Sequence, residues 1–142
     1  MHRMDEPTPT RMNIRTGLLL FAHGARDPRW ATPFQEVAAR ARVMQPDLPV
    51  QLAFLEFMSP TLPQACAALV AAGCTRVDVV PLFLGAGGHV RKDLPLLMDA
   101  ARAEHPGLEV QLHASIGESE RVMQAMAEVA VAMLPARQAD TT

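Results

Sequence analysis

The chain has 142 residues, the length of one ordinary domain with its own core. Hydrophobic residues make up 49% and charged residues 20%, which is typical of a globular protein. The formal net charge of −2 argues against a generally basic nucleic-acid binder, and the aromatic content of 4% argues against a base-stacking surface. No apolar run approaches the roughly 20 residues that span a bilayer. We therefore expect no nucleic-acid partner and no membrane partner.

The two ends of the chain differ from its middle. Residues 1–16 are polar, spaced by prolines and without an apolar signal core, so they predict a flexible tail. Residues 135–142 predict a second flexible tail, which leaves 17–134 as one domain. Cys66 and Cys74 do not form a CxxC pair. Without a secretory signal, they are expected to be small core residues of a protein in a reducing cytoplasm.

Apolar runs and amphipathic segments alternate along the domain. Four short apolar runs predict buried strands, and a helical segment follows each of them. The predicted strands are 17–22, 50–57, 76–84 and 108–114. The predicted helices run from between 27 and 33 to 44, from 59 to 73, from 93 to 104, and from about 118 onward.

Particular residues support the ends of these elements. Ser59 followed by Pro60 predicts an N-cap with proline in the first helical turn, and Gly73 predicts the end of that helix. Pro81 lacks an amide donor, so we expect a bulge or a sheet edge there. Asp93 is predicted to cap the third helix. The last helix is predicted to carry one apolar stripe, formed by Val122, Met126, Val129 and Met133.

The order βαβαβαβα predicts a three-layer α/β fold, with a four-stranded parallel sheet, right-handed crossovers and helices on both faces. In such sheets, ligands bind beyond the carboxyl ends of the strands, near the switch point in strand order. His23 follows the first predicted strand and His89 follows the third. Glu56, at the end of the second strand, is predicted to point to the same rim.

His23 and His89 are the main candidates for chemistry. A single histidine at a strand end is as readily a capping polar residue as a functional one, but two at equivalent positions favour function. The glycines of the segment GAGGHV allow a ligand to approach the backbone beside His89. This segment lacks the GK[ST] ending of a phosphate-binding loop. For Glu56, a carboxylate in an apolar setting and a solvent-exposed glutamate remain equally open.

Four basic residues cluster in the two segments that contain these histidines: Arg26, Arg29, Arg91 and Lys92. Each would ordinarily be a solvated charge, but their grouping favours a receptor for an anionic ligand. Of the other histidines, His105 fits a cation at a helix C-terminus, and the role of His113 stays open.

The chain resembles the CbiX-type sirohydrochlorin chelatases, the class II tetrapyrrole chelatases, in three segments that occur in order: FAHGARDP, LEF followed by SPTL, and GAGGHVRKDLP. That family has an HGSR-like loop and an HxxxDIP-like loop, and the resemblance to its short, single-domain form covers residues 18–134. Ala25 stands where the family usually has serine, which removes one hydroxyl from the site. Leu94 stands in place of isoleucine.

The resemblance implies a flavodoxin-like half of the chelatase fold and a lyase that inserts a divalent metal, typically Co²⁺, into sirohydrochlorin for cobalamin synthesis. It implies a homodimer that needs no cofactor beyond the substrate metal. His23, His89 and Glu56 would bind the metal or accept pyrrole protons, because neutral imidazole suits cobalt, nickel and iron and titrates near neutral pH. Gly87 and Gly88 would border the flat macrocycle, and the four basic residues would bind its carboxylates.

Three alternatives remain within the same chemistry: a siroheme-type ferrochelatase, a nickel chelatase, and a non-catalytic cobalt or nickel carrier. Imidazole and carboxylate ligands determine the order of metal affinities and do not select one metal. A carrier would use the same histidines, but it has no need for basic residues that bind a polycarboxylate. A histidine phosphatase is disfavoured, because that class needs an arginine directly before His-Gly, where this chain has Ala22.

Overall fold

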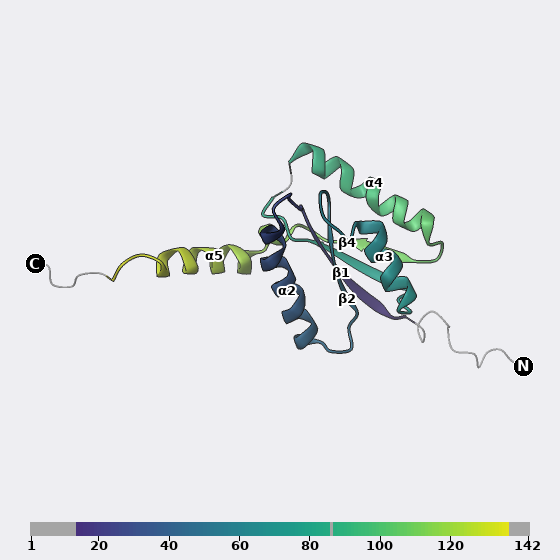
Figure 1. The fold of residues 1–142 in the computed structure, drawn as a ribbon, viewed down its shortest axis with the longest axis horizontal. Helices are drawn as coiled ribbons and strands as arrows, with labels where there is room; N and C mark the ends of the chain where they lie inside the picture. The colour runs from purple at the N-terminus through teal and green to yellow at the C-terminus, as the bar shows by residue number, and fades with distance from the viewer. Residues whose placement is uncertain (1–13, 86, 137–142) are drawn as a thin grey trace, which may run out of the picture.

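The computed structural model of the chain describes residues 14–85 and 87–136 (Figure 1). Its strands are β1 (Thr16–Ala22), β2 (Val50–Phe54), β3 (Arg76–Pro81) and β4 (Glu109–Leu112). Its helices are the 3-10 turns η2 (Pro28–Trp30) and η3 (Ile116–Glu118), and α2 (Ala31–Met44), α3 (Leu62–Ala71), α4 (Gly88–Glu104) and α5 (Glu120–Ala132). The strands pair in parallel in the order β2-β1-β3-β4, which confirms the predicted α/β fold.

An apolar core lies on each face of the sheet. On one face, α3 packs over β1 and β2 and α4 packs over β4, and Met98 is buried there. On the other face, α2 packs over β1 and β2, with Ala38 buried beside Phe54. Cys66 and Cys74 are free, buried thiols, as predicted, and burial raises the pKa of both. β1 is a nearly continuous apolar run because both of its faces are covered, whereas β3 alternates buried and half-buried residues.

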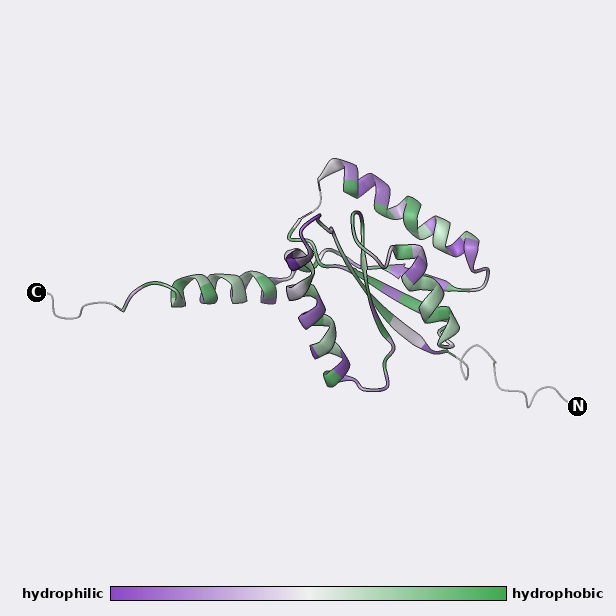
Figure 2. Ribbon diagram, in the orientation of Figure 1, coloured by the Kyte–Doolittle hydropathy of each residue, from purple (hydrophilic) through white to green (hydrophobic). Residues whose placement is uncertain are grey.

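The last helix departs from the predicted arrangement. α5 extends away from the sheet (Figure 1), and none of its residues is buried. The predicted apolar stripe is therefore present on α5, but it does not contact the chain's own sheet. Apolar residues dominate the helix (Figure 2), and its exposed side chains include Met123, Met126, Val129 and Val131.

The part of the sheet that a fourth helix would cover is polar. Val110 and Leu112 of β4 face the α3–α4 side, so Glu109, Gln111 and His113 face the other side and are exposed. An apolar helix would gain little by covering such a surface, because the polar groups would lose water. This accounts for the failure of the prediction for α5.

A hydrogen-bonded network of charges occupies this polar surface. The guanidinium of Arg76 donates to both carboxylate oxygens of Asp78, at 3.0 and 2.9 Å, and to Glu109 at 2.7 Å. The His113 Nε2 lies 2.7 Å from the Asp78 Oδ1, which gives this histidine a structural position. These contacts, chiefly the hydrogen bonds from Arg76, hold the pKa of Asp78 below its ordinary value.

Helix α3 begins later than predicted. Its N-cap is Thr61, whose hydroxyl accepts a hydrogen bond from the Gln64 amide at 3.4 Å, while the Gln64 side chain accepts one from the Thr61 amide at 2.9 Å. Ser59 was the predicted cap, but it lies in the preceding loop, before a cis peptide bond to Pro60. The reciprocal pair prevails because it satisfies two amide donors at once. Gly73, with φ of +96°, does follow the end of the helix.

Helix α4 begins earlier than predicted. Gly87 is its N-cap, and Asp93 and Pro95 both lie inside the helix. Aspartate followed closely by proline is a typical helix start, which explains the wrong boundary. As a consequence, His89 lies on the first turn of α4 and not in a flexible loop.

Neither the bulge nor the edge predicted at Pro81 occurs, because β3 is an inner strand and Pro81 is its last residue. The Leu82 amide donates to the Phe21 carbonyl oxygen at 2.7 Å, on the β1 side. Backbone amides alternate in direction along a strand, so the Pro81 nitrogen faces the β4 side. β4 ends at Leu112, opposite Val79, so the proline opposes no strand residue there.

The N-terminal tail was predicted to extend to residue 16, but the fold begins before that residue. β1 already begins at Thr16, and the Arg15 carbonyl accepts hydrogen bonds from the amides of Thr75 and Arg76, at 2.8 and 3.2 Å. The remainder of the two predicted tails, at 1–13 and 137–142, lies outside the described residues.

Within the described part of the chain, no helix combines the length and the hydropathy needed to cross a membrane.

The reciprocal hydrogen bonds between Thr61 and Gln64 give a test of where α3 begins. Thr61→Ala should lower the free energy of unfolding by about 1 kcal/mol, the usual effect of losing an N-cap. Ser59→Ala is the matched control and should change it by less than about 0.5 kcal/mol. Urea unfolding followed by circular dichroism at fixed protein concentration measures both. A larger effect at Ser59 than at Thr61 would restore the predicted cap.

The charge network gives a second test. Asp78→Asn should lower the free energy of unfolding at pH 7 by about 1–2 kcal/mol, because hydrogen bonds to charged groups are the stronger ones. The folded-state pKa of Asp78 lies below its ordinary value of 3.8, so its contribution is complete above that pH and is lost as the pH falls further.

The difference between the wild type and Asp78→Asn should therefore shrink between pH 7 and pH 3. Urea unfolding at the two pH values measures it. The control is Asp99→Asn, which removes an exposed carboxylate that is paired with Arg102 at 2.9 Å on one helix. A difference that persists unchanged at pH 3 would show that the charge of Asp78 is not what stabilises the fold.

Candidate functional site

The carboxyl ends of β1 and β3 lie side by side at the centre of the sheet, where the strand order reverses. The register pairs Phe21 with Pro81, so the residues two positions further along each strand meet as well. These are His23 and Phe83, whose rings stack with centroids 4.1 Å apart and planes 28° apart. His23 therefore lies at the switch point, where it was predicted.

Phe83 forms a fixed support for the His23 imidazole. Its side chain is only 1% exposed, and its ring lies 6.1 Å from that of Phe21. One face of the half-buried imidazole is thus covered by a buried aromatic ring, which restricts its orientation. Among the described residues no hydrogen bond to the His23 side chain is formed, so its nitrogens are not committed to the fold. Such a ring is available to a metal or a proton.

The loop after β2 is held against the loop after β1. The Leu55 amide donates to the Ala22 carbonyl at 2.8 Å, and the Glu56 amide donates to the His23 carbonyl at 3.1 Å. Gly24 has φ of +93°, and a Cβ there would overlap the Glu56 carbonyl oxygen. Only glycine permits this close approach. The chain segments of His23 and Glu56 are therefore adjacent, as predicted.

Glu56 does not have the apolar setting that its neighbours in the sequence had suggested as one possibility. β2 ends at Phe54, and Glu56 lies two residues beyond it with an exposed side chain. The solvent-exposed alternative is the correct one, because alternation along a strand no longer determines which way residues face after the strand has ended.

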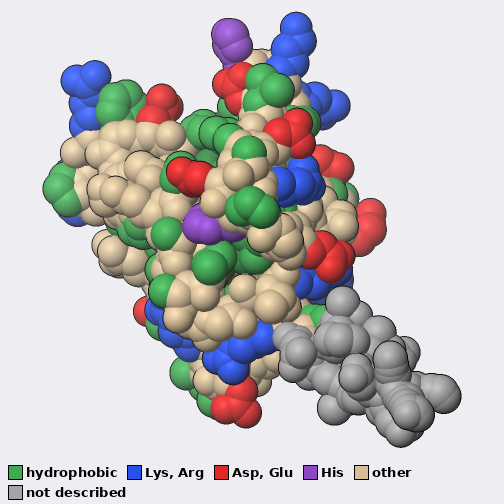
Figure 3. All heavy atoms as spheres, turned by 90° about the vertical axis from the view of Figure 1, so that its right-hand side faces the viewer, with side chains coloured by type: hydrophobic (Ala, Val, Ile, Leu, Met, Phe, Trp, Pro, Cys, Tyr) green, Lys and Arg blue, Asp and Glu red, His purple; other side chains and the backbone are tan. Residues whose placement is uncertain are grey.

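His89 and two of the basic residues lie together at the start of α4. His89, Arg91 and Lys92 are all exposed, and Figure 3 shows a histidine and basic side chains projecting at the upper end of the molecule, where α4 begins in Figure 1. A Cβ on Gly87 or Gly88 would meet no atom within 4 Å, so the space beside both glycines is open. The amino end of the helix adds partial positive charge.

The two arginines that follow His23 differ in their partners. Arg29 donates to Asp27 from Nε at 3.2 Å and from Nη2 at 2.8 Å, which raises the pKa of Arg29 and lowers that of Asp27. The Arg26 guanidinium carbon instead lies 4.8 Å from the centroid of the Phe57 ring. In the described ranges no carboxylate pairs with Arg26. Arg26 is therefore the one of this pair that is free for an anionic ligand.

His23, Glu56 and His89 follow three different strands at one edge of the sheet, but they do not enclose a metal site. Within 14–85 and 87–136, no three His, Cys, Asp or Glu side chains converge in a way that could hold a metal ion. The predicted three-ligand set is thus not assembled by the described residues of one chain. His105 is the C-cap residue of α4, at the helix end where it was expected.

Sequence reasoning missed two aromatic residues at this edge. Phe83 could have been found by aligning the predicted β1 and β3 in parallel, since the register places it beside His23. The sequence gives no indication of where Phe57 lies. Its position depends on a positive φ, and no neighbouring residue predicts that conformation.

The profile of the CbiX family matches residues 17–132 of the chain. A sirohydrochlorin cobaltochelatase of Saccharolobus islandicus is 32% identical over 103 residues, covering 68% of this chain and 77% of the relative. The sirohydrochlorin cobaltochelatase of Methanococcoides burtonii is 32% identical over 87 residues, which cover 61% of this chain and 66% of the relative.

Solved structures share the fold. The CbiX protein from Marinobacter aquaeolei VT8 has a TM-score of 0.74 at 32% identity, covering 82% of this chain and 95% of that one. SirB from Bacillus subtilis with Fe³⁺ has a TM-score of 0.72 at 25% identity, covering 86% of this chain and 49% of SirB. The sirohydrochlorin chelatase SirB from Bacillus subtilis subspecies spizizenii in complex with cobalt has a TM-score of 0.70 at 26% identity. The match covers 84% of this chain and 51% of that one. This chain therefore spans about half of each SirB chain.

The profile match extends over most of the described residues, and it agrees with the relatives at 32% identity and with the parallel sheet whose central switch point carries His23. The chain belongs to the CbiX family.

Proposed function

We propose that the chain is a sirohydrochlorin cobaltochelatase, a lyase of the cytoplasm that inserts Co²⁺ into sirohydrochlorin for cobalamin synthesis. The observation that carries this proposal is the stacked imidazole of His23 at the switch point of a CbiX-family fold. Curated relatives with the name sirohydrochlorin cobaltochelatase support the same activity.

Metal insertion needs a group that holds a partly dehydrated ion beside the macrocycle. Neutral imidazole suits cobalt, and His23 offers its nitrogens from a fixed ring. We assign the first contact with the metal to His23, and the second to His89, which is exposed at the start of α4, the helix that follows β3. The small number of protein ligands favours transfer, because open coordination positions remain for the pyrrole nitrogens.

Insertion also releases two pyrrole protons, which need acceptors. Histidine titrates near neutral pH and serves this purpose, and the exposed carboxylate of Glu56 can pass a proton to solvent. The peripheral carboxylates of the macrocycle would pair with Arg26, Arg91 and Lys92. Arg29 has a smaller role, because its guanidinium is already bound to Asp27.

Iron insertion is the second candidate, and the similarity to SirB with Fe³⁺ supports it. A metal carrier is disfavoured, since the described residues of one chain lack the closed ligand set that storage requires. The distinguishing experiment is anaerobic incubation of the chain with sirohydrochlorin and Co²⁺, Ni²⁺ or Fe²⁺, followed by visible absorption. We expect insertion to be fastest with Co²⁺.

The two histidines should be needed for this reaction. His23→Ala and His89→Ala should each lower the insertion rate by about 100-fold or more, the effect expected when a general base is lost. Circular dichroism should show an unchanged fold, because neither side chain belongs to the core. His113→Gln is the matched control and should retain activity. Near wild-type turnover in both alanine variants would overturn the two-histidine site.

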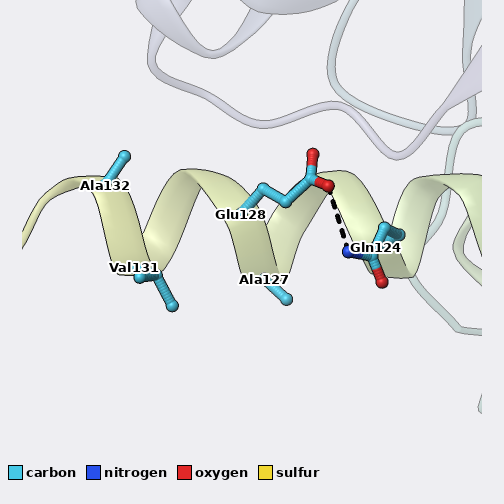
Figure 4. Close-up of a pocket in the computed structure, with 5 residues that line it drawn as sticks. All are labelled: Gln124, Ala127, Glu128, Val131 and Ala132. Carbon is cyan, nitrogen blue, oxygen red and sulfur yellow. Dashed lines mark hydrogen bonds between the residues drawn. The ribbon is translucent and has the colours of Figure 1, made fainter.

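We infer that the functional form is a homodimer in which α5 docks on a second copy of the chain. Met126 and Val129 of α5 are 49% and 54% exposed, and Met133, which follows the helix, is 78% exposed. Monomeric proteins avoid such an extended apolar surface. Figure 4 shows Gln124, Ala127, Glu128, Val131 and Ala132 on α5, all of them exposed and available to a partner.

A second copy is the occupant that the fold favours. Each chain extends one helix with an exposed apolar stripe, and a two-fold axis would bring the stripes of two copies together so that both are covered at once.

Light scattering at micromolar concentration should therefore give the mass of a dimer. Met126→Lys combined with Val129→Lys should yield a folded monomer, since neither side chain is buried within the chain itself. Val43→Lys, at an exposed position near the end of α2, is the control and should remain dimeric. A monomeric wild type would contradict the proposal.

A further inference from the structure

Phe57 has a backbone conformation that side chains disfavour. Its φ is +67°, and it is the one residue other than glycine with positive φ among the described residues. For a bulky side chain this left-handed conformation is uncommon and costs free energy. Glycine or asparagine would adopt it more readily, so the ring needs an explanation.

The fold itself does not supply that explanation. The Phe57 side chain is 57% exposed and belongs to neither of the two apolar cores. A large aromatic side chain that is exposed and backed by a strained backbone contributes little to stability. The ring is therefore exposed where a ligand could contact it.

The loop that carries Phe57 is joined to His23 by a backbone hydrogen bond. Phe57 directly follows Glu56, whose amide donates to the His23 carbonyl. The Phe54 amide donates to the Pro60 carbonyl at 2.8 Å, and this hydrogen bond joins the two ends of the loop that contains Phe57. Phe57 thus lies on a short, doubly anchored loop beside the proposed metal-binding imidazole.

The ring in turn positions a cation. The Arg26 guanidinium carbon lies 4.8 Å from the ring centroid, within the range of a cation–π contact. No described carboxylate competes for this guanidinium, in contrast with Arg29, which is bound to Asp27. The pair therefore presents a flat apolar surface and an oriented cation on one side of the site.

We propose that Phe57 and Arg26 together form a recognition element for the tetrapyrrole, with the Phe57 ring against the edge or face of the macrocycle and Arg26 on a peripheral carboxylate. This assignment rests on the proposed function. A flat conjugated ligand with carboxylates on its rim matches both surfaces, because aromatic contact and a bidentate guanidinium–carboxylate pair operate side by side. The strained backbone is retained because it places the ring for substrate.

Phe57→Gly separates this role from a structural one. The midpoint of urea unfolding should stay the same or rise, because glycine adopts positive φ freely. The dissociation constant for metal-free sirohydrochlorin, measured by fluorescence, should rise about 2- to 10-fold, the loss expected for one aromatic contact. In the insertion assay KM should rise while kcat stays within about 2-fold. Phe57→Trp, which keeps a flat ring, should restore binding.

Arg26→Gln should weaken binding as well, and more so at low salt, whereas Arg40→Gln on α2 is the charge-matched control and should leave it unchanged. Unaltered tetrapyrrole affinity in Phe57→Gly would overturn the inference while leaving the chelatase proposal intact. A change in the oligomeric mass of Phe57→Gly without a change in affinity would overturn it too, and would assign the ring to contact between copies. If the wild type itself binds no sirohydrochlorin, both proposals fall.

Discussion

The parallel pairing of β1 with β3 determines where His23 and Phe83 lie at the candidate site. These two strands are neighbours in space although a helix, a strand and another helix separate them along the chain. Their register places His23 on Phe83, and the buried phenylalanine then restricts the imidazole. A register shift of one residue would exchange the two faces of the strand and remove that support. The chemistry of the site thus depends on core packing several residues away.

The sequence predicts the parts of the fold that depend on local patterns. Apolar runs identified all four strands, and Gly73 marked a helix end, because hydrophobic period and glycine conformation act over a few residues. Helix starts were less accurate. Asp93 and Ser59 carry strong local signals for a cap, but the structure uses Gly87 and Thr61 instead. Several nearby residues compete for each cap, and the pattern alone does not rank them.

The remaining differences arise from contacts between distant segments. α5 carries the apolar stripe that the pattern predicts, yet nothing in its own sequence reports that the strands it would cover bear Arg76, Asp78 and Glu109. Likewise, the exposure of Glu56 and the ring stacked on His23 depend on where neighbouring strands end. The position of His23 was predicted correctly, because this residue directly follows an apolar run that the sequence identifies as a strand.

The contact of Gly24 with the Glu56 carbonyl makes the two sides of the candidate site differ in packing. The loops after β1 and β2 interlock there through this contact and the backbone hydrogen bonds to Ala22 and His23, whereas a Cβ at Gly87, the N-cap of α4, would meet no atom within 4 Å. Variation that adapts the site to another ion or a bulkier macrocycle is therefore easiest to accommodate on the α4 side, where a change does not disturb the imidazole.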